Sequence, residues 1–204
     1  MVHTDRIILG KGCAEIAIKA FGPKGTAVLF GGTPGNPSTF HEHKGSKEVF
    51  AKYPGWNVIM GGDTSWTQQG GFEAMSAVLA KGVPFDIVIF DNAATCRGMV
   101  RAFQQAGKPI QAMTGDAANG FFKDWEELSP TNPKFRVWSW GSCTWYSRVA
   151  LTVALEAKQG KTVPSQIFLP QPLFELKKGL YDPTMPDNFG FPIVPKSLEM
   201  QILR

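Results

Sequence analysis

The feature of this 204-residue sequence that most constrains its fold is a repeated change from a short apolar run to a cluster of small and polar residues. Four such runs occur, at 27–30, 57–60, 87–90 and 110–113, and each cluster is followed by the pattern of an amphipathic helix. Short buried strands that alternate with helices favour an α/β fold, in which a parallel sheet carries helices on both faces, as in flavodoxin-like or Rossmann-like domains. Ligands bind such sheets at the carboxyl ends of the strands, so we expect the polar clusters to meet at one edge.

Glycine and proline indicate where the predicted helices end. Gly22-Pro23 follows the first helix, because proline cannot continue a helix, and Gly82 and Gly107 are C-cap signals for the third and fourth. Beyond Pro170 we expect an extended, proline-rich tail that runs over the surface. The sequence predicts six helices: the first over 7–20, the second over 38–52, the third after Trp66 and ending at Gly82, the fourth ending at Gly107, the fifth over 120–128 and the sixth over 144–158. It also predicts strands over 135–140 and 167–169.

The composition argues against several classes of protein. The net charge is +4, but basic and acidic residues are interspersed and the densest basic spot is Lys177-Lys178, so we expect no nucleic-acid partner. No stretch approaches the roughly 20 apolar residues of a membrane helix. Residues 1–6 lead straight into globular sequence, so we expect no signal peptide, and the chain as given would stay in the cytoplasm.

Cysteine and histidine usage predicts neither a disulfide framework nor a metal site. Cys13, Cys96 and Cys143 are widely spaced and lie within helical patterns, which favours small buried residues. The histidines of His41-Glu42-His43 are two residues apart and do not share a helix face, and no nearby cysteine or third histidine completes a tetrahedral site.

No motif in the sequence indicates a cofactor or a catalytic centre. The segment 31–36 resembles a phosphate-binding loop only loosely, because it lacks the Gly-Lys-Ser/Thr ending. All three histidines lie before residue 44, and no nucleophile elbow of the Gly-x-Ser-x-Gly kind occurs. We therefore expect a non-enzymatic protein without a cofactor.

Three candidate ligand-binding residues lie at successive predicted strand ends: Trp66, Asn92 and Asp116. Sugars are bound by an aromatic face against the C–H face of the ring, and by planar amides and carboxylates that bond the hydroxyls. The set therefore favours a sugar or polyol ligand. Two other interpretations stay open: Trp66 as a core residue at a helix start, and Asn92 and Asp116 as helix N-caps.

Several segments, in their order and spacing, resemble the sugar-binding periplasmic proteins of ABC transporters, of the ribose-binding type (periplasmic binding protein type 1). Each segment is moderately specific, and together they extend over nearly the whole chain. They are Thr4-Asp5 with Gly10, 48–55, 91–98 with 99–107, Thr114-Gly115-Asp116, 160–164 and 185–192.

This resemblance implies two α/β lobes joined by a three-strand hinge, with a sugar in the cleft between them. Lobe closure would signal to a membrane permease, and the location would be periplasmic. The chain matches only from the start of the second lobe. Residues 1–140 would form that ligand-binding lobe, 141–169 the hinge crossing with a helix and strand of the first lobe, and 170–204 the C-terminal tail. A lone lobe offers only half the contacts, so we expect sugar binding that is weak or unmeasurable.

The sequence departs from the family at two places that add candidate site residues. Where the family often carries an arginine, in the helix that begins near Phe40, this chain has Phe40-His41-Glu42-His43, with Glu42 near the expected position. Where the family has a polar residue and then proline at the hinge, this chain has Trp140-Gly141-Ser142-Cys143. His41, Glu42 and Trp140 therefore join the candidate ligand set.

Two alternatives to a solute-binding protein are a structural or regulatory remnant and a small flavodoxin-like enzyme. The remnant would self-associate as a homo-oligomer through the exposed interlobe surface, for example by exchange of the sixth helix. The enzyme would need a catalytic constellation that the sequence does not indicate.

Overall fold

A six-stranded sheet, parallel except at one edge, forms the centre of the computed structural model, which describes residues 2–141 and 146–191. The strand order is β3-β2-β4-β5-β6-β8, and only β8 runs antiparallel to its neighbour. The predicted parallel α/β fold is therefore confirmed. The strands are β2 (Lys24–Gly31), β3 (Gly55–Asp63), β4 (Ile87–Ile89), β5 (Ala112–Asp116), β6 (Val137–Trp140) and β8 (Leu173–Glu175).

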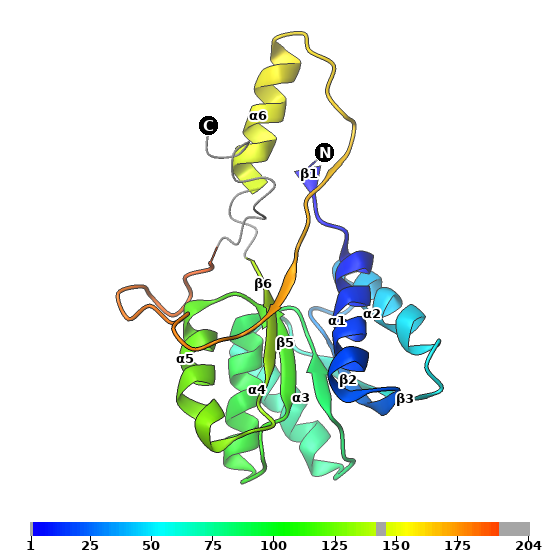
Figure 1. Cartoon of the computed structure of the whole chain (residues 1–204), viewed down its shortest axis with the longest axis vertical. Helices are drawn as coiled ribbons and strands as arrows, with labels where there is room; N and C mark the ends of the chain where they lie inside the picture. Colours follow the sequence, from blue (N-terminus) through cyan, green and yellow to red (C-terminus); the bar gives the residue numbers. More distant parts are fainter. Residues whose placement is uncertain (1, 142–145, 192–204) are drawn as a thin grey trace.

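Helices cover both faces of this sheet (Figure 1). One face packs against α1 (Arg6–Phe21) and α2 (Pro37–Phe50). The other face packs against three helices, namely α3 (Gln68–Ala80), α4 (Ala93–Gln105) and α5 (Asn119–Leu128), the last followed by the 3-10 turn Ser129–Thr131. These helices were all predicted, and their ends differ from the predicted ones by a few residues.

Strand alternation explains why the apolar runs are continuous. In β2, Val28 and Phe30 point into the core with α3, α4 and α5, whereas Ala27 and Leu29 point into the core with α1 and α2. All four are almost fully buried. A strand that is covered on both faces needs apolar residues at every position, which is the pattern in the sequence.

Capping residues set the ends of the helices near the carboxyl edge of the sheet. The Asp5 side chain accepts hydrogen bonds from the backbone N–H groups of Ile7 and Ile8 and so begins α1. Asn36 caps α2 in the same way, with Pro37 as the first helical residue. At the opposite, amino edge of the sheet, Gly22 ends α1 with a φ of 88°, in the left-handed region that favours glycine.

A small second unit projects beyond the carboxyl edge of the sheet, and we call it the arm (Figure 1). It consists of β1 (Val2–His3), α6 (Tyr146–Lys158) and β7 (Ile167–Phe168). Strands β1 and β7 pair in parallel as a separate two-stranded sheet. The helix predicted over 144–158 and the strand predicted over 167–169 are thus present, although Thr144 lies outside the described residues. No residue of α6 is buried.

The chain beyond Pro170 differs from the expected surface tail. It contributes β8, which pairs with β6, and Leu176, which is buried in the core with α3, α4 and α5. Pro170 and Pro172 precede this strand, and proline is compatible with an edge strand because no neighbour needs its missing N–H on the outer side. The last part of the predicted tail, 192–204, lies outside the described residues.

Several smaller expectations concern the described residues alone. Cys13 and Cys96 are buried free thiols, as predicted, and Cys143 lies outside the described residues. Burial raises the pKa of both thiols, which makes them poor nucleophiles. None of the helices in the described chain combines the length and apolar character needed to cross a membrane.

Candidate functional site

The carboxyl edge of the parallel sheet, which faces the arm in Figure 1, gathers the polar side chains of the candidate site. Trp66 follows β3, Asp91 follows β4, and Asp116 is the last residue of β5. Arg6 and Glu42 reach the same place from α1 and α2. The site is therefore built from five separate elements.

Close packing of α1 on α2 brings Arg6 and Glu42 together. A Cβ atom at Gly10 would collide with the backbone carbonyl of Glu42, and one at Gly45 would collide with the backbone carbonyl of Ile7. The Ser46 hydroxyl donates to the carbonyl of Gly10 at 2.9 Å. Because Gly10 and Gly45 have no side chain, α1 and α2 approach more closely than any other residue at these positions would allow.

A chain of polar contacts joins the four side chains at the centre of the site. Arg6 Nη1 donates to Glu42 Oε1 at 2.8 Å and lies 3.4 Å from Asp91 Oδ2. Trp66 Nε1 donates to the other oxygen of Asp91, Oδ1, at 2.9 Å. The Glu42 and Asp91 side chains are only 14% and 9% exposed, so water screens these contacts poorly.

Trp66 sits on a strained turn between β3 and α3. Ser65 and Trp66 both have a φ of 52°, in the left-handed region that non-glycine residues seldom adopt. A Cβ at Gly32 would meet Trp66 atoms Cε2, Cζ2 and Cδ2, which include the bond shared by the two rings. One face of the indole therefore lies against the Gly32 backbone. The ring is half-buried and also packs against the core with α3, α4 and α5.

Asn92 and Asp116 differ in how their side chains are used. The Asn92 Oδ1 accepts from the N–H of Thr95 at 2.9 Å and from its hydroxyl at 3.0 Å, which are the contacts of an N-cap at the start of α4. Asp116 Oδ1 accepts from the N–H of Ala93. The side-chain carbonyl oxygen of Asn92 is thus occupied by the cap of α4. Asp116, the last residue of β5, lies beside the start of the same helix.

Burial and like charge perturb two carboxyl groups of the site. Burial, with the nearby Asp91 charge, raises the pKa of Glu42 to about 8, although Arg6 opposes the shift. Burial raises the pKa of Asp116 to about 6, and the Ala93 N–H opposes that shift. A carboxyl group with a raised pKa keeps its proton to higher pH, so Glu42 can donate as well as accept hydrogen bonds beside the guanidinium of Arg6. Such a set offers both donors and acceptors to hydroxyl groups.

The other two predicted site residues lie apart from these contacts. His41 is exposed at the start of α2, where its ring packs edge-on against Phe40 at 5.7 Å between centroids. Trp140 is only 2% exposed and belongs to the core with α1 and α2. Ser142 and Cys143, the rest of the hinge departure, lie outside the described residues.

Arg6 and Asp91 belong to the site, and sequence reasoning missed both. Asp91 is adjacent to Asn92, but its carboxylate accepts from Trp66, whereas the Asn92 side chain caps α4. The three-residue spacing from Asn92 to Thr95 is the signal that could have separated them. Arg6 is 36 residues from Glu42 and 85 from Asp91, and no local pattern links them.

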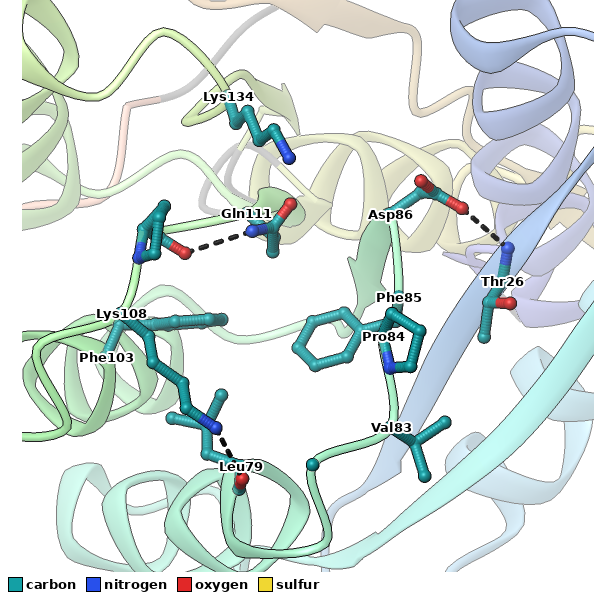
Figure 2. Close-up of a pocket in the computed structure, with 12 residues that line it drawn as sticks. Thr26, Leu79, Val83, Pro84, Phe85, Asp86, Phe103, Lys108, Gln111 and Lys134 are labelled. Carbon is teal, nitrogen blue, oxygen red and sulfur yellow. Dashed lines mark hydrogen bonds between the residues drawn. The ribbon is translucent and has the colours of Figure 1, made fainter.

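The cavity of about 380 Å³ shown in Figure 2 lies at the opposite, amino edge of the sheet. There the Asp86 carboxylate accepts from the N–H of Thr26 at 2.8 Å, and Lys108 Nζ donates to the carbonyl of Leu79 at 2.7 Å. Its lining includes none of the strand-end residues. Over residues 2–141 and 146–191, no group of three or more His, Cys, Asp and Glu side chains is arranged to hold a metal ion.

Known proteins share this fold. The chain superposes on an Actinobacillus succinogenes solute-binding protein with bound D-allose (TM-score 0.69, 19% identity, 85% of this chain and 59% of that chain). It also superposes on a Bacillus halodurans protein with bound myo-inositol (TM-score 0.70, 20% identity, 85% and 59%). A third match is the binding protein of a Shewanella arabinose transporter with bound L-arabinofuranose (TM-score 0.74, 16% identity, 85% and 58%).

The chain spans less than three fifths of the length of these solved structures. No curated protein sequence matches it significantly. A family model described as a periplasmic binding protein domain matches residues 1–162, which is most of the chain. The chain therefore belongs to the family of periplasmic binding protein domains.

Proposed function

We propose that this chain binds a carbohydrate or polyol at the carboxyl edge of its sheet. The observation that carries the proposal is the convergence of Trp66, Asp91, Arg6 and Glu42 in one chain of contacts, next to Asp116. An aromatic ring supplies the apolar contact for a sugar C–H face, and the carboxyl and guanidinium groups supply hydrogen bonds for its hydroxyls. The sugars bound in the structurally similar proteins support the same ligand class.

The domain organisation follows from the same proposal. Residues 1–140, apart from β1 in the arm, would act as the ligand-binding lobe, and 141–169 as the hinge crossing with elements of the opposite lobe. The tail over 170–204 would return to the ligand-binding lobe, since β8 pairs with β6. In a protein with both lobes, closure over the sugar would present a surface to the membrane permease in the periplasm.

A titration of this chain with D-allose, myo-inositol and L-arabinose tests the proposal. Nuclear magnetic resonance of the indole N–H groups detects even weak binding, and we expect dissociation constants in the millimolar range, about 4 kcal/mol of binding free energy, because one lobe supplies part of the contacts. Trp66→Ala and Asp116→Asn should each weaken binding at least about tenfold, roughly the effect of one lost stacking or charged contact. Lys134→Ala, at the opposite edge, is the matched control and should change nothing. Absence of any response to all three sugars would reject the proposal.

A further inference from the structure

The Asp91 carboxylate is contacted on both of its oxygens by groups from different elements. Oδ1 accepts from Trp66 Nε1 at 2.9 Å, and Oδ2 lies 3.4 Å from Nη1 of Arg6. The same Nη1 donates to Glu42 at 2.8 Å. Asp91 thus joins the turn after β3 to the first turn of α1.

The orientation of the Trp66 ring is fixed from three sides. The left-handed backbone at Ser65 and Trp66, which non-glycine residues seldom adopt, directs the side chain. Gly32 supports one face of the ring. The hydrogen bond to Asp91 then sets the rotation of the indole about its own axis, because only one edge of the ring carries the N–H.

Burial of the Asp91 carboxylate costs folding free energy, which a merely structural role does not explain. Its side chain is 9% exposed and lies beside Glu42, and a buried carboxylate near another carboxyl group destabilises the fold unless its partners are well placed. A phenylalanine in place of Trp66 would supply an aromatic ring without needing a buried acceptor. The pairing of indole and carboxylate therefore points to a need for a fixed ring orientation.

We propose that Asp91 is a positioning residue that locks the Trp66 ring and the Arg6 guanidinium into one rigid unit for ligand binding. The inference rests on the proposed function, since Trp66 is taken as the stacking surface. Asp91 itself acts through these two side chains. Its neighbour Asn92 has no such role, because its carbonyl oxygen is committed to the cap of α4.

Four variants separate this role from a structural one. Asp91→Ala removes both contacts, whereas Asp91→Asn keeps an acceptor for the indole and loses the charge beside Arg6. Trp66→Phe keeps a stacking ring without the N–H. Lys134→Ala is the control, because Lys134 lines the cavity at the opposite edge of the sheet. The Trp66 indole N–H resonance is identified by its absence in Trp66→Phe.

In the sugar-free protein, we expect Asp91→Ala to move the Trp66 indole resonance toward that of a water-exposed indole and to speed its hydrogen exchange at least tenfold. Asp91→Asn should leave the resonance near its original position. With myo-inositol as the probe, Asp91→Ala should weaken binding about tenfold and Asp91→Asn two- to fourfold, in the range of one lost hydrogen bond. In the Trp66→Phe background, the effect of Asp91→Ala should shrink, because the two residues act together.

An unchanged Trp66 resonance and exchange rate in Asp91→Ala would overturn the proposal, as would full myo-inositol affinity in that variant. If Asp91→Ala fails to fold, the Asp91→Asn and Trp66→Phe variants still test the proposal. Normal affinity in Trp66→Phe would show that the indole N–H is not needed. The proposed function fails differently. Full sugar affinity in Trp66→Ala would remove Trp66 from the site, whereas loss in Trp66→Ala with no effect at Asp91 would reject only the positioning role.

Discussion

The lobe and the arm of this molecule are built from similar residues and are covered very differently. The lobe packs helices on both faces of its sheet, and large side chains such as Phe103 and Phe121 are fully buried. In the arm, α6 has no buried residue, and its Leu151 and Leu155 are 61% and 50% exposed. A helix of 13 residues is marginal in water unless an apolar face is covered. The difference teaches that the lobe supplies its own core, whereas α6 leaves its apolar side chains exposed.

The largest predicted effect would test that contrast with one truncation in each region. Phe103→Ala in α4 should lower the free energy of unfolding by about 3–5 kcal/mol, because it leaves a cavity in a close-packed core. Leu151→Ala in α6 should change it by no more than about 0.5 kcal/mol, as expected for an exposed site. Urea unfolding followed by circular dichroism measures both. A cost for Leu151→Ala close to that of Phe103→Ala would mean that the arm is packed in solution.

The lobe was largely predictable because its sequence signals are local. Gly22-Pro23 and Gly82 stop helices through backbone geometry alone, and the apolar runs report burial on both sheet faces. The strand β8 was missed because Leu173-Phe174-Glu175 is short, follows two prolines and pairs only with a strand more than 30 residues earlier. Its place in the sheet is decided by tertiary packing, which a local pattern does not encode.

The site was predictable in part, for a related reason. The positions of Trp66 and Asp116 follow from strand ends, which the sequence marks clearly. The choice between Asp91 and Asn92 depends on which side chain the cap of α4 consumes, and Arg6 enters only through the packing of α1 on α2. Contacts between distant segments therefore determine the polar half of the site.

A second prediction concerns the buried edge of the lobe and its dependence on pH. The pKa of Glu42 is raised from an ordinary 4.5 to about 8, so the folded state keeps a proton that the unfolded state releases. The unfolding free energy should then fall as pH rises between those values, by up to about 1.4 kcal/mol for each unit of the shift. Asp116, raised to about 6, contributes in the lower part of this range.

Glu42→Gln removes the titrating group and should flatten the decline in stability between about pH 5 and pH 8, the range between the ordinary and the raised pKa of Glu42. Urea unfolding at each pH measures the decline. Glu48→Gln is the matched control on the same helix, because Glu48 is exposed and pairs with Lys11 at the surface. It should leave the slope unchanged. An equal slope in the wild type and in Glu42→Gln would show that Glu42 is ionised in the folded protein at neutral pH.

The smallest predicted effect tests what covers the arm in solution. Exposed apolar side chains on a helix that buries none of its residues favour contact with another protein surface, and a second copy of this chain offers the same face. We therefore expect the average mass from light scattering to rise with concentration, and Leu151→Lys to suppress that rise by placing a charge on the face.

Val83→Lys is the matched control, since Val83 is also exposed, at 46%, but lies on the lobe at the amino edge of the sheet. If both lysine variants suppress association equally, general charge repulsion explains the effect. If the wild type stays monomeric at every concentration, the arm is stable without a covering surface, and the contrast between the two regions is one of exposure alone.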